Sequence, residues 1–391
     1  MKTLKALILV LGVLTFTSEF ALAQAPVKIG ASISLTGTYA KLGGYTQDGY
    51  LMCAKEINDK GGLLGRKLEF VIYDDRSDAA TAIKLYEKLI TEDKVELVMG
   101  PYSSPITKAA ATVSEKYKKL MVASLAAETA IWEQGYKYLF MTISPAEVYM
   151  EGVVELAAER GLKTIAVIPE DTSFAKAAAQ GTVALAKKRG MQVVMHEAYP
   201  KGTMDFSGLL IRIKALNPDV IIGGTYFDDA VATTRQMKEL DVNPKMVGMT
   251  VGGDVPDFGK QLAKTAEYVY GSTQWAENLT YPGAKEFIEN YKKLYNREFS
   301  YHAPAGWGAC QIFAEAIRRA NSLDSDKIRE QLLKLKITTA FGDYQVDERG
   351  FQTAHKMVLI QWQDGKRVTV WPAHLAEAKP RYPMPPWSQR K

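Results

Sequence analysis

Two adjacent serines followed by a proline form the pattern with the clearest chemical meaning in this chain. Ser103, Ser104 and Pro105 come shortly after the apolar run 95–99. Serine is favoured just before a helix and proline at its first position, so Ser104 is predicted to cap a helix over residues 105–117. The free N–H groups at such a helix start bind a carboxylate, and a serine hydroxyl adds a donor. The pattern therefore predicts an anion-binding point.

Small, polar and aromatic residues also follow the ends of other predicted strands. In open parallel sheets, ligands bind at the carboxyl ends of the strands, so these residues are candidates for one pocket. Taken alone, a residue of this kind is more often part of the hydrophobic core than a ligand contact. The candidates outside the serine motif are Tyr39, Tyr102, Ala126, Ala127, Glu128, Phe174, Tyr226, Val251 and Asp254.

Patterns for catalysis, metals and cofactors are weak or missing from the sequence. The acidic group at 74–78 does not match a calcium loop, and Asp78 is better interpreted as the N-cap of the next helix. The four histidines have no zinc spacing. The glycine-rich stretch 61–67 precedes a strand, so it is interpreted as a helix end and turn. We expect no catalytic residue, no metal and no cofactor.

Strand and helix signals alternate along most of the chain. Near-continuous apolar runs separated by amphipathic segments predict α/β architecture with parallel sheets covered by helices on both faces. The alternation runs over 27–142, restarts over 146–272, and is followed by a mostly helical section at about 280–340. Asp364-Gly365 between two apolar runs predicts a hairpin. A chain of 391 residues exceeds what one core usually supports, so two lobes are expected.

The N-terminus has the pattern of an export signal. Lys2 and Lys5 precede an apolar region at 6–16, and Ala21-Leu22-Ala23 fits a cleavage site, so residues 1–23 are predicted to be a signal peptide. No later stretch is long and apolar enough to span a bilayer. The formal charge of +5 is scattered, which argues against nucleic acid as a partner.

The two cysteines lie far apart in the sequence. Cys53 and Cys310 each share helical spacing with apolar residues, which indicates buried positions. A disulfide would require the two helices to touch at that point. The sequence leaves this open, and we favour two buried thiols over a disulfide.

Several motifs together resemble a known family. They are Lys28-Ile29-Gly30, Leu35-Thr36-Gly37, the stretch from Ile57-Asn58 to Gly65-Arg66, Tyr73-Asp74-Asp75 and Gly100-Pro101-Tyr102-Ser103-Ser104. The chain resembles the periplasmic leucine/isoleucine/valine-binding protein family, the solute receptors of ABC importers. The resemblance implies the type I periplasmic-binding fold, in which two doubly wound parallel-sheet lobes are joined by crossover strands and enclose a ligand cleft. Lobe one would comprise 26–143 plus 278–355, and lobe two 144–277 plus 356–391.

The resemblance also implies roles for some of the candidates. Ser104 would hold a ligand carboxylate, with Tyr102 and Ser103 beside it, and Ala126 would add a backbone N–H. Phe174 and Tyr226 would be the aromatic lids of the second lobe.

One position departs from the family. The acid that pairs with a ligand's α-amino group would fall near Val251, which carries no charge, and Glu128 stands where the family often has threonine. Asp254 or Glu128 would have to replace that acid, or the ligand has no amino group.

The function expected from the resemblance is capture of a hydrophobic or branched-chain amino acid in the periplasm and delivery to a membrane permease, by a monomer without enzymatic activity. One alternative is the same role for an aromatic or aliphatic carboxylate or amide that lacks an α-amino group. A more remote one is an exported enzyme, which would need a nucleophile and a base across the cleft. A sensing domain of a receptor is disfavoured, because no transmembrane or kinase segment accompanies it.

Overall fold

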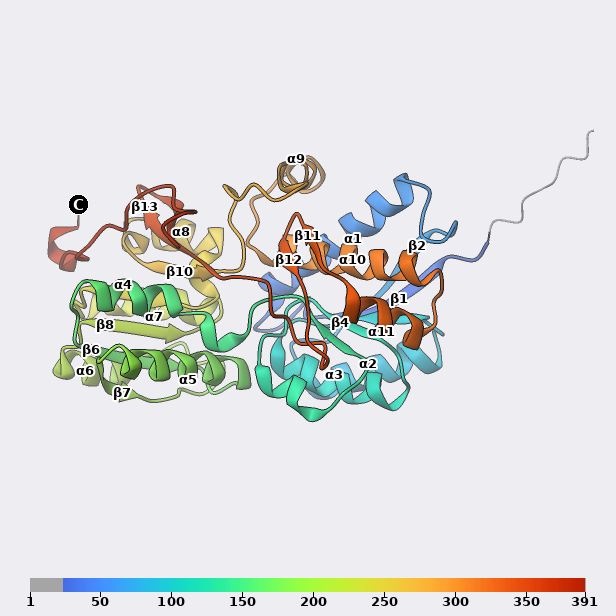
Figure 1. Ribbon diagram of the computed structural model, residues 1–391. Coiled ribbons are helices and arrows are strands. Elements are labelled where there is room, and N and C mark those ends of the chain that lie inside the picture. The colour runs from blue at the N-terminus through green and yellow to red at the C-terminus, as the bar shows by residue number, and fades with distance from the viewer. Residues whose placement is uncertain (1–23, 391) are drawn as a thin grey trace, which may run out of the picture.

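The first set of alternating elements builds a five-stranded parallel sheet. A computed structural model describes residues 24–390, so the predicted signal peptide lies outside the described residues (Figure 1). The strand order is β2-β1-β3-β4-β5. The elements are β1 (Val27–Ile33), α1 (Ala40–Asp59), β2 (Leu68–Asp74), α2 (Ala79–Thr91), β3 (Leu97–Met99), α3 (Ser104–Lys116), β4 (Met121–Ala123) and β5 (Leu139–Met141).

The second set builds a seven-stranded sheet with the order β14-β13-β10-β9-β8-β6-β7. All neighbours in it are parallel except β13 with β10 and β14 with β13. The elements before the last hairpin are α4 (Glu151–Glu159), β6 (Thr164–Pro169), α5 (Ser173–Lys188), β7 (Gln192–His196), α6 (Ser207–Leu216), β8 (Val220–Gly224), α7 (Asp228–Glu239), β9 (Met246–Met249), α8 (Pro256–Leu262) and β10 (Tyr270–Thr273).

The remaining helices return to the first sheet before the chain ends on the second. They are α9 (Ala284–Tyr295), α10 (His302–Ala320) and α11 (Ser325–Lys334), followed by a small ribbon of β11 (Ile337–Thr339) and β12 (Gly342–Tyr344). Helix α10 packs along α1, which places orange beside blue in Figure 1. The last strands are β13 (Val358–Gln363) and β14 (Lys366–Trp371). The predicted hairpin turn is confirmed: Asp364 and Gly365 both have positive φ, as a type I′ turn requires.

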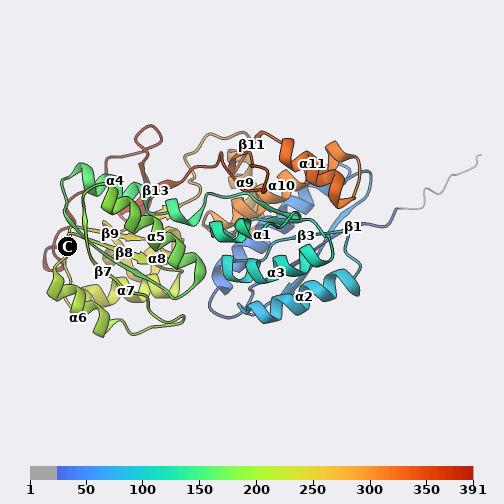
Figure 2. The ribbon, with the colours of Figure 1, turned by 60° about the horizontal axis from the view of Figure 1, so that its bottom comes forward.

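Each sheet is covered on both faces, which explains its continuous apolar strands. Side chains of β1 pack with α1, α10 and α11 in one cluster, whereas α2 and α3 cover the other face of the first sheet. In the second sheet α4 and α5 cover one face and α6, α7 and α8 the other. Figure 2 shows the two layered bodies side by side. The predicted α/β class with two doubly wound sheets is therefore confirmed.

Within the described residues the chain crosses between the two sheets three times, and the crossings contact one another. The backbone N–H of Ser144 donates to Gln274 Oε1 at 3.0 Å, and the Ser144 hydroxyl donates to the carbonyl of His355 at 2.9 Å. The ring Nε2 of His355 lies 2.9 Å from the carbonyl oxygen of Gln274. Burial lowers the pKa of His355 to about 4, so the ring is neutral at pH 7. These contacts join the crossings into one connection, while the lobe boundaries given above stay a prediction.

The preference for two free thiols is wrong. Cys53 on α1 and Cys310 on α10 form a disulfide, with their Cα atoms 6.2 Å apart. Helical spacing correctly indicated that both side chains are buried, but it carries no information on which helices touch. The bridge fastens α10, which comes late in the chain, to the first helix of the first lobe.

Candidate ligand-binding site

The serine pair lies where β3 ends and α3 begins, and both side chains are buried. The helix starts at Ser104, preceded by Ser103 in extended conformation, and neither hydroxyl caps it. Ser104 is therefore not the N-cap that the sequence predicted. Its oxygen instead accepts hydrogen bonds from the backbone N–H groups of Ala127 at 2.8 Å and Glu128 at 3.2 Å.

This arrangement sets the chemistry of the Ser104 hydroxyl. A hydroxyl has two acceptor lone pairs and one donor hydrogen. Since two backbone N–H groups already occupy the oxygen, its hydrogen is left to donate to a third group. Together with the positive end of the α3 dipole, Ser104 can therefore donate to a carboxylate.

Aromatic rings from the second lobe face this serine. Phe174 lies in the first turn of α5 and Tyr226 follows β8. Their ring centroids are 5.7 Å apart, and the Tyr226 ring lies 4.5 Å from that of Tyr39 and 6.4 Å from that of Tyr102. Rings at such separations attract one another beyond their burial of apolar area. The rings of the two lobes thus pack directly against each other.

The space between these side chains is small. A cavity with about 10 Å³ of room lies between them, roughly the minimum that a single water molecule needs. Seven of the predicted candidates line it, together with Leu125, Tyr149 and Tyr301, which sequence reasoning missed. The seven are Tyr102, Ser103, Ser104, Ala127, Phe174, Tyr226 and Val251.

Tyr149 and Tyr301 occupy positions that no local pattern marks. Tyr149 follows the first crossing, and Tyr301 precedes α10 in the returning helical section. Their hydroxyl oxygens are 3.5 Å apart, and the Tyr149 ring packs on Phe174 at 5.0 Å. Tyr301 reaches the cleft because the helical section around α10 packs back on the first sheet, and no local sequence pattern shows this.

Four predicted candidates lie outside the lining of this cavity. Tyr39 packs behind Tyr102 and Tyr226, and Ala126 is buried beside Ala127. The carboxylate of Glu128 lies 3.5 Å from Lys108 Nζ. Asp254 belongs to a different cavity.

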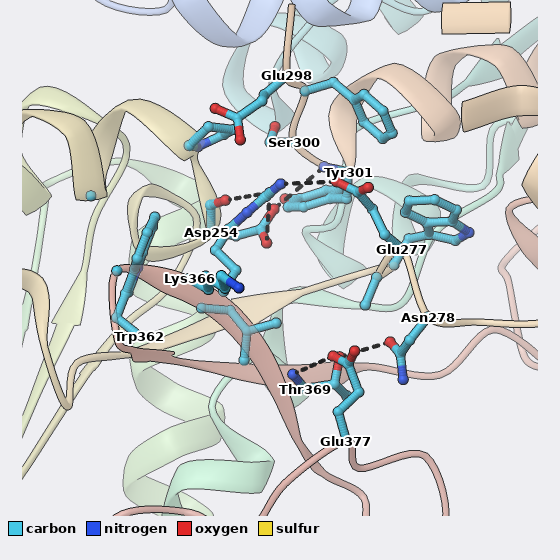
Figure 3. Close-up of a pocket in the computed structure, with 18 of the residues that line it drawn as sticks. Asp254, Glu277, Asn278, Glu298, Ser300, Tyr301, Trp362, Lys366, Thr369 and Glu377 are labelled. Atoms are coloured by element: carbon cyan, nitrogen blue, oxygen red, sulfur yellow. Dashed lines mark hydrogen bonds and ion pairs between the residues drawn. The ribbon is translucent and has the colours of Figure 1, made fainter. Parts of the chain in front are cut away.

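Asp254 lies in the wall of a larger cavity on the other side of Tyr301, with a volume of about 460 Å³ (Figure 3). It accepts from the backbone N–H of Tyr301 at 3.3 Å and lies 3.5 Å from Arg367 Nη1. Arg367 also reaches Glu277 at 3.3 Å, so the charges at the centre of this cavity pair with one another. Burial raises the pKa of Asp254 to about 7, although the Arg367 charge opposes this shift.

Two buried carboxylates next to the cleft were not singled out from the sequence. Glu170 follows β6 directly and Asp229 lies in the first turn of α7. Burial raises the pKa of both, that of Asp229 to about 7, and the negative charge of Glu170 adds to the shift at Asp229. Both follow strands that had been predicted, so their nearness to the cleft could have been inferred from the strand-end rule.

Several contacts hold the lobes together around the cleft. Lys41 on α1 pairs with Asp257 on α8, and Lys260 on α8 pairs with Glu298 at 2.7 Å. Lys201 donates to the carbonyl of Ser77 at 3.1 Å and lies over the Tyr39 ring. These contacts and the packed rings describe a closed arrangement of the lobes.

Residues 24–390 contain no group of three or more His, Cys, Asp or Glu side chains that could hold a metal ion. Within the same part of the chain, no helix is long and apolar enough to cross a membrane.

Two α/β lobes with a small buried site between them define the class of two-lobed binding proteins. Residues 26–367 match the model of the family described as periplasmic binding protein, and the chain belongs to this family. A Leu/Ile/Val-binding protein homolog 7 from Brucella suis biovar 1 is 28% identical, with 96% of this chain and 99% of the relative covered. A homolog 8 from the same organism is 29% identical over 95% of this chain and 97% of its own length.

Solved structures agree on the fold. The branched-chain amino acid transporter substrate binding protein LivJ from Streptococcus pneumoniae, in complex with isoleucine, has a TM-score of 0.80 at 22% identity. The match covers 92% of this chain and 100% of that one. A solute binding protein from R. palustris in complex with benzoate has a TM-score of 0.79 at 17% identity, covering 88% of this chain and 95% of that one. The same fold thus accepts ligands with and without an amino group.

Proposed function

We propose that this protein is the solute receptor of an ABC importer and captures a small carboxylate, in the first place a hydrophobic or branched-chain amino acid. The observation that carries the proposal is Ser104. Its hydroxyl oxygen is occupied by two backbone N–H groups, its hydrogen is left to donate, and it stands at a helix N-terminus facing aromatic rings of the other lobe.

The proposed cycle follows from the closed packing of the rings. The cavity is too small for an amino acid, so the lobes must part before a ligand can enter. The carboxylate then docks at Ser104, and closure brings Phe174 and Tyr226 over the apolar part. The closed form is presented to a membrane permease. We propose that the protein works in the periplasm as a monomer; the family and the N-terminal pattern of an export signal support the periplasmic location.

A carboxylate or amide without an α-amino group is the second candidate. Val251 lines the cavity without offering a charge, and the rings around it fit an apolar or aromatic body. The benzoate complex of the R. palustris protein is consistent with such ligands.

An exported enzyme receives little support from the side chains near the cleft. Ser300 Oγ and His302 Nδ1 are 2.6 Å apart, which is the spacing of a nucleophile and its base. However, both residues are fully buried, and burial lowers the pKa of His302 to about 3. An imidazole with such a pKa is a poor base at neutral pH, so this pair is better interpreted as structural.

A ligand screen tests the proposal. The mature chain is titrated calorimetrically with amino acids, aromatic acids and short-chain acids, and its melting temperature is recorded with each. We expect one binding site per chain, and about 2.7 kcal/mol of added stability when a ligand is present at about 100 times its Kd. Absence of binding across all three classes would refute the proposed function.

A further inference from the structure

The carboxylates buried around the cleft differ in how well they are satisfied. They are Glu128, Glu170, Asp229 and Asp254, each with less than a tenth of its surface exposed. A buried carboxylate is costly unless hydrogen-bond donors or a cation compensate its charge. The number and strength of the partners therefore show which carboxylate has capacity for a ligand.

Asp229 and Asp254 are committed to the protein itself. Asp229 accepts from the Tyr199 hydroxyl at 2.7 Å and from two backbone N–H groups at 2.9 Å. Asp254 accepts a hydrogen bond from the backbone N–H of Tyr301 and forms an ion pair with Arg367. Glu128 has a longer contact, at 3.5 Å from Lys108, and one oxygen without a partner.

Glu170 and Glu128 each have one buried oxygen without a partner within residues 24–390, and of the two only Glu170 lacks an ion pair. One oxygen of Glu170 accepts a single backbone N–H, from Gly202 at 3.3 Å, and the other is buried with no hydrogen-bond partner among the described residues. No ion pair is formed by Glu170 within residues 24–390. The nearby Lys201 directs its ammonium group to the carbonyl of Ser77 in the other lobe.

The surroundings of Glu170 add further unsatisfied hydroxyls. Within residues 24–390, oxygens of Ser103, Ser173, Tyr39 and Tyr226 are also buried without a hydrogen bond of normal geometry, although the Tyr39 hydroxyl lies near those of Ser103 and Tyr226. The backbone N–H of Glu170 donates to the carbonyl of Gly224 at 2.9 Å, which places Glu170 beside the end of β8, two residues before Tyr226. The charge of Glu170 also contributes to the raised pKa of Tyr226. Buried polar groups are rarely left unpaired, so this cluster indicates a place for a polar group from outside the chain.

The chemistry of the cluster selects the kind of group. An ionised carboxylate only accepts hydrogen bonds, and hydroxyls can accept as well as donate. A group with several N–H donors and a positive charge can donate to the Glu170 carboxylate and to the neighbouring hydroxyl oxygens.

We propose that Glu170 binds the cationic group of the ligand, so that the carboxylate of a zwitterion is held by Ser104 in one lobe and its ammonium by Glu170 in the other. This rests on the proposed function and specifies its ligand class. It accounts for the uncharged Val251, because the acid is supplied from the end of β6 instead. The two ligand charges then contact opposite lobes, so the ammonium is recognised only as the lobes close.

The test compares each amino acid with its des-amino analogue. Leucine with 4-methylpentanoate, and phenylalanine with 3-phenylpropanoate, are titrated into wild type and Glu170→Gln. Removing a carboxylate from a desolvated charge pair should weaken the amino acids about 30-fold or more, and the analogues less than about threefold. Asp171→Asn is the matched control, since Asp171 is exposed and pairs with Lys176. It should leave all four affinities within about twofold.

Further variants keep the test decisive. Glu170→Asp retains the charge at a shorter reach, so it should weaken the amino acids more than their analogues even if Glu170→Gln folds poorly. Loss of amino-acid selectivity in Glu128→Gln or Asp254→Asn, with Glu170→Gln unaffected, would overturn the inference. So would equal losses for amino acids and analogues, or a wild type that binds only the analogues. If wild type binds none of the four probes, this inference fails, whereas the proposed function fails only if the wider ligand screen above also finds no binding.

Discussion

Replacing Ser104 with alanine removes a hydroxyl that accepts hydrogen bonds from two backbone N–H groups and, in the proposed function, donates one to the ligand carboxylate. The N–H groups of Ala127 and Glu128 would both lose their acceptor at a site where Ser104 is 1% exposed. A buried group left unsatisfied costs about 1–3 kcal/mol, and the 3.2 Å bond lies at the weaker end. We therefore expect the free energy of unfolding to fall by about 2–4 kcal/mol, more than the roughly 1 kcal/mol of a lost N-cap.

The same substitution should also weaken binding. A hydrogen bond to a charged group contributes about 1.5–3 kcal/mol, which corresponds to about a 10- to 150-fold rise in Kd. Urea unfolding and calorimetric titration of the same preparations measure both effects. Ser103→Ala is the matched control for stability alone, because the Ser103 hydroxyl has no hydrogen-bond partner within residues 24–390 and its loss should barely change the free energy of unfolding. An unchanged Kd in Ser104→Ala, or a smaller loss of stability than in Ser103→Ala, would refute the reasoning.

Three further outcomes are expected. Replacing Cys53 and Cys310 with alanine should lower the free energy of unfolding by about 2–5 kcal/mol, because the bridge closes a loop with a sequence separation of 257, while ligand affinity stays unchanged; a double variant as stable as wild type in denaturant would contradict this. Small-angle scattering should show a smaller radius of gyration with saturating ligand than without, and identical curves would argue for lobes that do not move. Asp229 has a pKa of about 7 in the folded chain against 3.8 in the reference carboxyl, so the folded chain binds the extra proton and the free energy of unfolding should fall as pH rises from about 4 to 7. Urea unfolding at several pH values should show a shallower fall in Asp229→Asn, and an unchanged slope would count against a raised pKa.

The alternating strands and helices could be predicted well because each element has its own short pattern of apolar residues. Strands buried on both faces must be continuously apolar, so most of them stood out. The strands β5, β9, β11 and β12 were not predicted; like β3 and β4, which were, they have only three or four residues, a length that shows no period and leaves the assignment open. The disulfide was missed for the opposite reason: contact between α1 and α10 depends on a connection hundreds of residues long.

The site was predictable where it depends on strand ends. Ser104, Phe174 and Tyr226 follow strands, and the structure brings them to one cavity. The hydrogen bonding of Ser104 was not predictable, since its partners lie on another loop. Tyr301 reaches the cavity only through the returning section of the chain.

The aromatic rings that pack across the closed cleft compete with a ligand for the same contacts. A ligand that enters must replace contacts that Tyr39, Phe174 and Tyr226 already make with one another. Its apparent affinity is therefore the intrinsic affinity multiplied by the fraction of molecules whose lobes are parted; if about half are parted, the apparent Kd rises about twofold. Substitutions that weaken ring-to-ring packing without touching the ligand can then tighten binding. Ligand selectivity and apparent affinity can therefore be changed through different side chains.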